Sequence, residues 1–565
     1  MSYWQLQIKY YRFDASEQNK QTHSRFNMKK LARTALKIAS ATILGLFAVT
    51  FAAAQDPAAE QSVEKPNIIV IMADDLGLGD VSCYGATALE TPNIDRLANK
   101  GCRFTSGYCS ASTCTPTRYS LLTGNYAFRR KGTGIAPPSA PAIIQPGVET
   151  VASILKRAGY QTAVIGKWHL GLGSRDEGGP DWNGALKPGP LEIGFDTCFL
   201  LPTTNDRVPQ VYVKDHHVLN LEQSDPLWVG RKKPSEDHPT GKSHRDTLKM
   251  DWSHGHNGTI HNGISRIGFY TGGNAARFRD EDLADEWVLQ SQQFIESNKD
   301  KPFFLFFSSH DVHVPRIPHE RFQGKTTLGF RGDSIVQLDW CVGELVDTLD
   351  RLELTEKTLI VFCSDNGPVM DDGYKDSALE NLGDHRAAGQ YSGGKYSVYE
   401  GGTRTPFITC WPGTISPAVS DEVVCTIDLC ASFAKLTGQS LAEPACVDSL
   451  DVMDALLGKA GAEGRDHFVS QNNNGLAMGL RVGNWKLQRY YEKFTKNHIV
   501  ERKLKKTKVP QFQLFDLAND PAEKNNVIEQ HPDVADQMKA RLKQIVDRGR
   551  TRNERNDRPA EQARE

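Results

Sequence analysis

The sequence Asn67-Ile-Ile-Val-Ile-Met72, which runs on into Ala73-Asp74-Asp75, decides the fold class. A short unbroken apolar run that stops abruptly at polar residues is typical of a parallel strand buried on both faces of a sheet. Four later runs have the same character, at residues 162–165, 302–307, 358–363 and 406–410. These runs predict the central strands of one sheet.

Stretches with helical periodicity lie between these runs, at residues 93–101, 150–158, 284–297 and 332–352. Strands that alternate with helices predict an α/β fold, with a large, mostly parallel or mixed sheet sandwiched by helices. Residues 174–280 are rich in Gly, Pro, His and Asp, and we expect long substrate-facing loops there.

A change of character after residue 461 predicts a smaller C-terminal domain. A hairpin-like stretch at 475–487 and a short apolar run at 513–516 indicate a short antiparallel sheet, and an amphipathic stretch at 532–548 indicates a helix. We therefore expect a large domain over 64–461, a small domain over 462–550 and a charged tail over 551–565.

The N-terminal region resembles an export signal. Met28-Lys29-Lys30 precedes an apolar, Ala-rich run from Ile38 to Ala54, which ends in small residues. We predict a leader and signal peptide over 1–54, cleavage near Ala54, and a periplasmic or secreted protein. An uncleaved N-terminal anchor is the alternative, and either Met1 or Met28 is the true start.

The composition excludes binding that is driven by bulk charge. Among 565 residues, 67 Lys and Arg face 69 Asp and Glu, which leaves a formal net charge of −2. A nearly neutral chain is not expected to bind nucleic acid. Apart from the N-terminal run, the sequence has no apolar segment near the ~20 residues of a membrane span, so we expect no stable membrane association. The eleven Cys are too few for a disulfide scaffold, and their odd number leaves at least one thiol unpaired.

Polar side chains follow four of the apolar runs. They are Asp74-Asp75, Lys167-Trp168-His169, His310-Asp311-Val312-His313 and Asp365-Asn366. Because ligands bind at the carboxyl ends of strands in open α/β sheets, we expect these residues at one edge. Asp74, Asp75, Asp365 and Asn366 offer only hard oxygen donors, which favours Ca²⁺ or Mg²⁺. In the alternative, one Asp caps a turn and the other is solvated.

The most specific feature is Cys114-Thr-Pro-Thr-Arg118, which continues to Leu122-Thr-Gly124. Pro116 fits the first position of a helix, which would place Cys114 at a helix N-terminus that favours an anion. Arg118 lies about one turn along on the same side. In the alternative, Cys114 is a buried thiol or forms a disulfide with Cys109.

This stretch resembles the signature of the type I sulfatases, arylsulfatase-like members of the alkaline phosphatase superfamily, which is Cys-x-Pro-Ser/Thr-Arg followed by Leu-Thr-Gly. The resemblance is strongest to secreted bacterial glycan sulfatases and covers nearly the whole chain after the leader. Further motifs match in order and spacing, at residues 66–77, 91–98, 166–171, 364–367, 394–406 and 514–521. The resemblance implies that the 64–461 domain is catalytic and that the chain is a sulfuric ester hydrolase.

The resemblance also assigns roles to single residues. It implies that a formylglycine-generating maturation enzyme converts Cys114 to 3-oxoalanine (Cα-formylglycine), whose hydrate attacks sulfur. The implied divalent cation, Ca²⁺ with Mg²⁺ possible, would bind Asp74, Asp75, Asp365, Asn366 and residue 114. Arg118 and Lys167 would stabilise the hydrate, Lys395 would bind sulfate, His313 would protonate the leaving oxygen, and His169 would help to release sulfate.

Five polar loop clusters are expected to determine the substrate: 181–183, 205–207, 254–257, 371–372 and 384–386. Thr204 is the nearest match to a sulfate-contacting hydroxyl of the family, and Arg207 and His385 are the other substrate-binding candidates. Trp and paired carboxylates suit a sugar ring. We therefore expect an exo-acting carbohydrate sulfatase for sulfated galactose or N-acetylgalactosamine, with a lipid sulfate as the open alternative.

Two rival functions stay open from the sequence. A phosphomonoester or phosphonate hydrolase of the same superfamily would share the fold and the metal edge. A noncatalytic glycan-binding pseudosulfatase would keep Cys114 as a thiol. The Cys-x-Pro-x-Arg stretch favours a sulfatase over the first rival, and the mass of the peptide that contains Cys114 would test the second.

Overall fold

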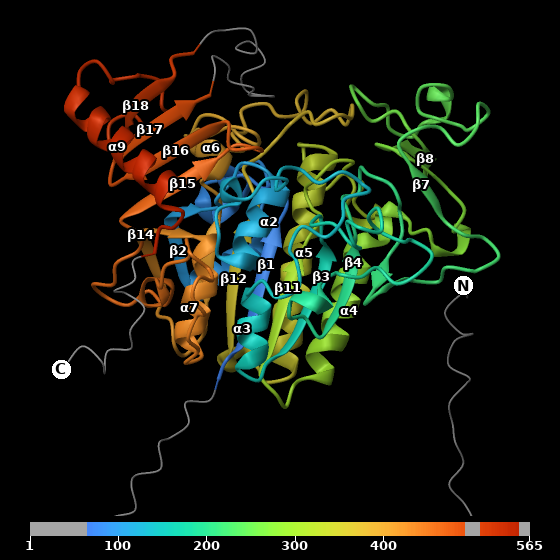
Figure 1. Ribbon diagram of the computed structural model, residues 1–565, viewed down its shortest axis with the longest axis horizontal. Coiled ribbons are helices and arrows are strands. Elements are labelled where there is room, and N and C mark those ends of the chain that lie inside the picture. The colour runs from blue at the N-terminus through green and yellow to red at the C-terminus, as the bar shows by residue number, and fades with distance from the viewer. Residues whose placement is uncertain (1–64, 492–508, 553–565) are drawn as a thin grey trace, which may run out of the picture. The chain divides into compact units, whose positions relative to one another are not determined.

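Strand β1 (Asn67–Ala73) lies inside a ten-stranded sheet and is wholly buried. Figure 1 shows the computed structural model, which describes residues 65–491 and 509–552. The predicted leader and signal peptide and nearly all of the predicted tail lie outside the described residues. The described residues belong to one compact unit.

The main sheet has a parallel centre with antiparallel pairs on both sides of it, and one outermost pair of strands is again parallel. Its strand order is β14 (Ala418–Cys425), β2 (Cys102–Tyr108), β13 (Phe407–Cys410), β12 (Thr358–Ser364), β1, β11 (Phe303–Ser308), β3 (Gln161–Lys167), β4 (Thr197–Leu201), β5 (Val213–Lys214) and β6 (His217–Val218). The five strands from β12 to β4 are parallel, so their carboxyl ends meet at one edge.

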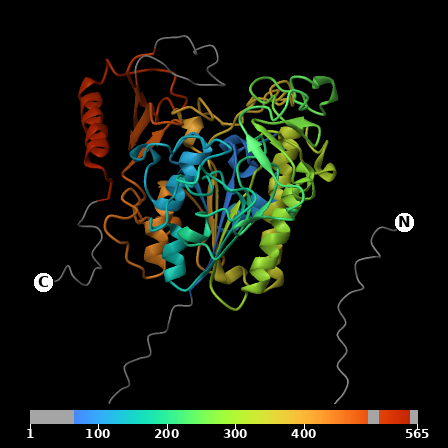
Figure 2. The same ribbon diagram turned by 45° about the vertical axis from the view of Figure 1, so that its right-hand side comes forward.

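Helices cover both faces of this sheet (Figures 1 and 2). One face packs on α1 (Pro92–Lys100), α4 (Leu283–Ser297) and α5 (Phe330–Arg351), and the other on α2 (Cys114–Thr123), α3 (Val151–Arg157) and α7 (Leu429–Leu436). Successive side chains of a strand point to opposite faces. Ile68, Val70 and Met72 accordingly belong to one core, and Ile69 and Ile71 to the other. Burial on both sides explains why the run is continuously apolar.

The C-terminal part forms a second layer. Its antiparallel sheet has the order β15 (His467–Gln471), β16 (Ala477–Val482), β17 (Trp485–Tyr490) and β18 (Phe512–Asp516). Helix α9 (Pro532–Arg548) packs on this sheet through its apolar stripe, with Met538, Leu542 and Ile545 against Leu480 and Leu487. Two short helices, α6 (Glu400–Thr403) and α8 (Met453–Leu456), precede this layer.

The predicted α/β fold with a small antiparallel C-terminal sheet and a helix is confirmed. The five predicted strands and four predicted helices all form, with ends that differ by up to two residues. The prediction for 174–280 was wrong in part, because this range contributes β4, β5 and β6 to the main sheet. It also forms two small pairs, β7 (Trp228–Gly230) with β10 (Phe269–Thr271) and β8 (Ile260–His261) with β9 (Ile264–Ser265). Among the described residues, no helix is both long and apolar enough to cross a membrane.

Candidate active site

Adjacent strands bring four oxygen donors together at one edge of the sheet. β1 and β12 are parallel neighbours with Ala73 beside Ser364, so the residues that follow them meet. Asn366 Nδ2 donates to Asp75 Oδ1 at 2.7 Å, and the backbone N–H of Asp75 donates to Asp365 Oδ1 at 3.3 Å. Asp74, Asp75, Asp365 and Asn366 are all fully buried.

The electrostatics of this cluster suit a cation. Burial, followed by the charge of Asp365, raises the pKa of Asp74 well above its ordinary value, and burial also raises the pKa of Asp75. Within the described part of the chain, Asp74 Oδ1 and Asn366 Oδ1 are buried without a hydrogen-bond partner. One oxygen each from Asp74 and Asp75 and one ring nitrogen of His313 lie within 4.8 Å of one another. Buried oxygens that lack partners and repel one another are the donor set that Ca²⁺ or Mg²⁺ requires.

Three cationic side chains already neutralise part of this acidic charge. Arg118 donates to Asp365 Oδ2 from Nε at 3.0 Å and from Nη2 at 2.7 Å. Lys167, the last residue of β3, contacts Asp74 through Nζ. Because of Arg118, Lys167 and Lys395, the pKa of Asp365 lies below its ordinary value although burial raises it.

Lys395 approaches the cluster from a loop. Its Nζ donates to Asp75 Oδ2 at 2.9 Å and to Asp372 Oδ2 at 2.8 Å. Burial lowers the pKa of Lys395, but Asp372 and Asp75 outweigh burial and hold it well above its ordinary value. The side chain is therefore a buried, permanently charged ammonium group beside the metal-ligand candidates.

Cys114 is the first residue of α2 and is 1% exposed. The helix thus begins two residues earlier than the prediction from Pro116. Cys114 Sγ lies 3.1 Å from His169 Nδ1, while Cys109 is a separate free thiol whose Sγ faces Thr403 O at 3.4 Å. The alternative of a Cys109–Cys114 disulfide is therefore wrong for this structure. All eleven Cys are free thiols in the structure.

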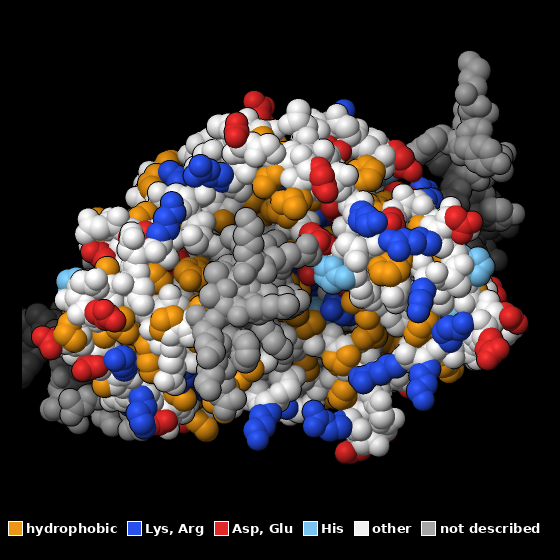
Figure 3. All heavy atoms as spheres, turned by 90° about the horizontal axis from the view of Figure 1, so that it is seen from above, with side chains coloured by type: hydrophobic (Ala, Val, Ile, Leu, Met, Phe, Trp, Pro, Cys, Tyr) orange, Lys and Arg blue, Asp and Glu red, His pale blue; other side chains and the backbone are white. Residues whose placement is uncertain are grey.

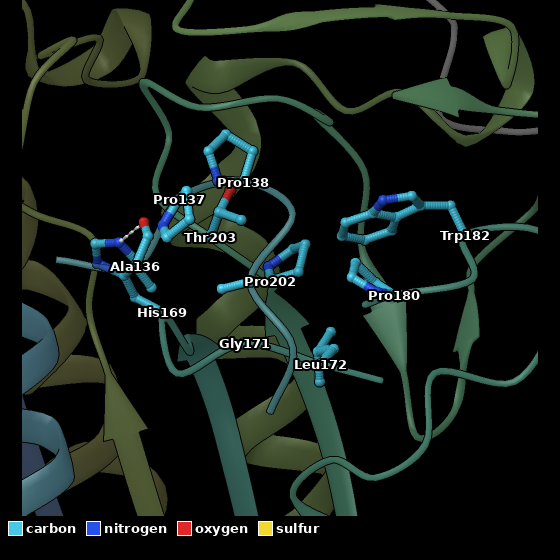
Figure 4. A pocket seen from close by; sticks show the side chains of 11 residues that line it. Ala136, Pro137, Pro138, His169, Gly171, Leu172, Pro180, Trp182, Pro202 and Thr203 are labelled. Atoms are coloured by element: carbon cyan, nitrogen blue, oxygen red, sulfur yellow. Dashed lines mark hydrogen bonds between the residues drawn. The ribbon is translucent and has the colours of Figure 1, made fainter. Parts of the chain in front are cut away.

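The hydrogen bonds of His169 determine its tautomer. Its Nε2 lies 3.0 Å from the carbonyl oxygen of Ala136, which can only accept, so Nε2 carries the proton (Figure 4). Burial, followed by the charges of Lys167 and Arg207, holds the pKa of His169 well below its ordinary value. The ring is therefore neutral near pH 7, and its unprotonated Nδ1 points at the side chain of residue 114.

His313 has the opposite tautomer. Its Nδ1 lies 2.7 Å from Val314 O and 3.2 Å from Asn205 Oδ1, so Nδ1 carries the proton and Nε2 remains for the site. Burial, followed by Lys395 and Lys167, holds the pKa of His313 well below its ordinary value. His310 faces elsewhere, because Trp287 Nε1 donates to its Nδ1 at 3.1 Å.

A small cavity opens above these groups, with a volume of about 90 Å³. This space exceeds the ~30 Å³ of one water molecule, so a small group such as a tetrahedral oxyanion can enter it. The residues that line it are Cys114, Ile135, Asp206, Arg207, His256, His313, Asp372, Lys395 and Tyr396. Lys395 and Arg207 bring two positive charges to this cavity beside Cys114, and each is paired with an acid, Asp372 and Asp206 respectively.

Arg207 is fixed at this cavity by its neighbours. Its Nη1 donates to Thr204 Oγ1 and to Asp206 Oδ1, both at 2.9 Å, and His256 Nε2 lies 2.9 Å from Asp206 Oδ2. Thr204 itself is fully buried and donates to Asp206. Arg207 thus lines the cavity, whereas Thr204 does not line it and accepts a hydrogen bond from Arg207.

The loop clusters expected to bind substrate divide between different places. Asp206, Arg207, His256 and Asp372 line the cavity beside Cys114, and Trp182 lines a second, apolar cavity on the other side of His169 (Figure 4). His385 lines a separate cavity, and its Nε2 lies 2.9 Å from Asp80 Oδ1.

Two residues that line the cavity were not predicted from the sequence. Tyr396 donates from its hydroxyl to Asp372 Oδ1 at 3.0 Å, and Ile135 forms part of the wall. Tyr396 follows Lys395 directly, so a search around the matched Lys would have found it. Ile135 carries no chemical signal in the sequence.

Comparison with known proteins identifies the family. The profile of the sulfatase family matches residues 66–439, which include the cation cluster, Cys114 and Lys395. The chain belongs to the sulfatase family. A second profile, described as the C-terminal part of N-sulphoglucosamine sulphohydrolase, matches residues 392–548. The chain is thus a sulfuric ester hydrolase, which decides against the phosphatase alternative.

Individual relatives cover most of the chain. An N-acetylgalactosamine-6-O-sulfatase of Bacteroides thetaiotaomicron is 48% identical over 488 residues, which are 86% of this chain and 94% of that one. Human arylsulfatase A is 30% identical over 82% of this chain and 83% of its own length. A solved structure from work on glycosaminoglycan metabolism by B. thetaiotaomicron superposes with a TM-score of 0.82 at 47% identity. It covers 86% of this chain and 99% of its own.

The separate location of His385 leads to a testable prediction. His385→Asn should destabilise the fold, because it disturbs buried Asp80, with an expected loss of about 1–3 kcal/mol. The same change at His256, which also sits 2.9 Å from a buried Asp but lines the cavity, should raise KM. Thermal unfolding and steady-state kinetics of both variants distinguish the two roles. A raised KM for His385→Asn at unchanged stability would assign that residue to the substrate.

Proposed function

We propose that this sulfatase removes the 6-sulfate from N-acetylgalactosamine, or from a related galactose-configured sugar, at the end of a sulfated glycan. The observation that carries the proposal is the 48% identity to an N-acetylgalactosamine-6-O-sulfatase along nearly the whole of both chains. The steryl-sulfatase relatives are 30–32% identical, which argues against the alternative of a lipid sulfate. Figure 3 views the face above the strand ends, where Lys and Arg side chains are frequent toward the side that carries β7 and β8. A basic rim of this kind suits a polyanionic chain.

The nucleophile proposed here is formylglycine made from Cys114. A thiol at this position would be a poor nucleophile, because burial raises the pKa of Cys114 and leaves it protonated. Conversion to an aldehyde, whose hydrate supplies an attacking oxygen, removes this problem. A maturation enzyme in the host must perform the conversion, and a chain that keeps the thiol would be the pseudosulfatase alternative.

Cationic side chains around the cavity are proposed to bind the sulfate group. Lys395 and Arg207 line the cavity, and Lys167 contacts Asp74 in the adjoining acidic cluster. In a buried site these charges attract an anion more strongly than they would in water. Asp206 and Thr204 hold Arg207 in one orientation, which reduces the cost of ordering it when the substrate binds.

The two histidines are proposed to move protons on opposite sides of sulfur. His313 keeps Nε2 toward the site, and the negative charge of a bound sulfate ester would raise its pKa and let it protonate the leaving oxygen. His169 presents an unprotonated Nδ1 to residue 114, where it can accept a proton from a hydroxyl and so help to expel sulfate. Because their tautomers are fixed by backbone carbonyls, each ring has one available nitrogen.

A divalent cation is proposed to bind Asp74, Asp75, Asp365 and Asn366 together with residue 114. The partnerless buried oxygens of Asp74 and Asn366 support this ligand set. When bound, the ion would act as a Lewis acid on a sulfate oxygen. Ca²⁺ and Mg²⁺ both prefer oxygen ligands. We also propose export of the protein through the N-terminal signal, with cleavage near Ala54.

The substrate proposal predicts a clear preference. With enzyme whose formylglycine is confirmed, kcat/KM on N-acetylgalactosamine 6-sulfate should exceed that on the 4-sulfate by ~10-fold or more, because the cavity holds only the sulfate and the sugar must approach in one orientation. The test compares kcat/KM on N-acetylgalactosamine 6-sulfate, N-acetylgalactosamine 4-sulfate, galactose 6-sulfate and a steryl sulfate. Faster turnover of the 4-sulfate or the steryl sulfate would contradict the proposal.

The proposed nucleophile predicts a lower mass for the peptide that contains Cys114 and a loss of activity when Cys114 is replaced. The peptide that contains Cys114, purified from the native host, should be about 18 Da lighter than its thiol form. Cys114→Ala should lower kcat/KM by ~10³-fold or more, whereas Cys109→Ala, a matched change at a buried Cys, should remain active. An unshifted mass together with full activity would refute formylglycine catalysis.

The cation proposal predicts a coupled loss of stability and activity. Chelation should lower the melting temperature and abolish turnover, because the acidic cluster is then left to repel itself. Adding the ion back at ~100 times its Kd should raise the free energy of unfolding by about 2.7 kcal/mol. Asn366→Ala should weaken the stabilisation by Ca²⁺ or Mg²⁺, while Asp384→Asn, at an exposed acid outside the cluster, should leave it unchanged. Full activity after exhaustive chelation would exclude the ion.

A further inference from the structure

The Lys395 loop, defined as residues 392–399, lies between the cation cluster and the C-terminal sheet. Its backbone is bonded to the segment that follows Asn366 and to the segment that precedes Cys114, because Lys395 N donates to Pro368 O at 3.0 Å and Tyr396 N donates to Ser112 O at 2.7 Å. The loop runs directly into α6, which begins at Glu400. A displacement of α6 would therefore be transmitted to Lys395 over five residues.

Glu400 carries a buried network that joins this loop to the C-terminal sheet. Its Oε1 accepts from Lys486 Nζ of β17 at 2.7 Å, and its Oε2 accepts from Tyr108 at 2.5 Å and from Arg404 at 3.1 Å. Its backbone N–H donates to Glu523 Oε2 at 2.5 Å, and Lys486 Nζ also lies 3.0 Å from Glu523 Oε1. One Lys therefore bridges two carboxylates that come from different layers.

These groups are all buried. Glu400, Lys486 and Glu523 are at most 4% exposed. Burial raises the pKa of Glu523 to about 7, while Lys486 and Arg404 lower the pKa of Glu400 to about 2 although burial raises it. Removing one member of a buried charge network leaves its partners uncompensated, so the remaining groups must move. We expect the Lys395 loop, which leads directly into Glu400, to move with them.

A second set of contacts attaches the same sheet to the segment before Cys114. Ser112 N donates to Gln471 O of β15 at 2.9 Å, and Gln471 N donates to Ser110 O at 3.2 Å. Val398 of the Lys395 loop packs with Ala477 of β16 and Tyr490 of β17. The C-terminal sheet thus contacts both segments that carry the cavity residues Cys114 and Lys395.

We propose that Glu400, Lys486 and Glu523 are positioning residues for sulfate binding, which hold the Lys395 loop so that the Lys395 ammonium stays at the cavity. The inference rests on the proposed sulfate-binding role of Lys395. None of the three residues lines the cavity. Their effect must therefore pass through Lys395 and its neighbours in the loop.

A double-mutant cycle tests this coupling. Lys486→Met, which removes the charge but keeps the length of the side chain, should raise KM for the sulfated sugar and lower kcat/KM by ~10-fold. In a Lys395→Ala background, the same change should lower kcat/KM by less than about 2-fold, because the group that it positions is already gone. Lys486→Arg, which keeps the charge, should restore part of the wild-type KM. If Lys486→Met does not fold, the isosteric change Glu523→Gln replaces it in the cycle.

Arg465→Met is the matched control, since Arg465 forms a fully buried ion pair with Asp428 at another contact between the C-terminal and main parts. Its effect on kcat/KM should be the same with and without Lys395. Equal losses for Lys486→Met in both backgrounds would overturn the positioning role and leave a purely structural one. An inactive wild-type enzyme with confirmed formylglycine would instead overturn the proposed function.

Discussion

The electrostatic constraint on which this structure depends is the meeting of three carboxylates and an amide at the ends of β1 and β12. β1 and β12 are adjacent parallel strands that end side by side, so the residues that follow them lie close together. The acids are fully buried, so their repulsion is not screened by water. The protein offsets it with charges from three other segments: Arg118 from α2, Lys167 from β3 and Lys395 from a loop. The proposed cation would complete this balance and would add a positive charge beside the cavity that we propose for sulfate.

This arrangement explains how a nearly neutral chain can bind a strongly acidic group. The cationic side chains of the site are held by buried partners, while the face seen in Figure 3 carries charges of both signs. Three cations in the site are each paired with an acid: Arg118 with Asp365, Lys395 with Asp372, and Arg207 with Asp206. Such pairing fixes the side chains before the substrate arrives, which is the basis of electrostatic preorganisation.

Much of the fold was predictable, for physical reasons that differ between elements. The continuous apolar runs of β1, β11 and β12 reveal strands buried on both faces, and polar residues directly after them reveal the ligand edge. β2 (Cys102–Tyr108) was not predicted, because it lies near the margin of the sheet and buries only alternate residues over its first half. The composition of residues 174–280 predicts loops also at 197–201, because β4 is a five-residue strand inside a Gly- and Pro-rich stretch. In the site, Asp74, Lys167 and Asp365 were predictable from strand ends. The placement of His385 on Asp80, far along the chain, depends on tertiary packing that no local pattern records.

The attachment of the Lys395 loop and α6 to β17 and to Glu523, which follows β18, has a consequence for how the protein is made. Every residue that we place in contact with sulfate or the cation is synthesised by position 395, yet Lys486 and Glu523 emerge from the ribosome about 90 and 130 residues later. A nascent chain at that stage holds the acids, the lysines and the histidines but not the part that brings Lys395 to its place. The enzyme would gain its affinity for sulfate only near the end of synthesis. A premature stop codon late in the reading frame would therefore impair the active site, although it removes none of the residues that line it.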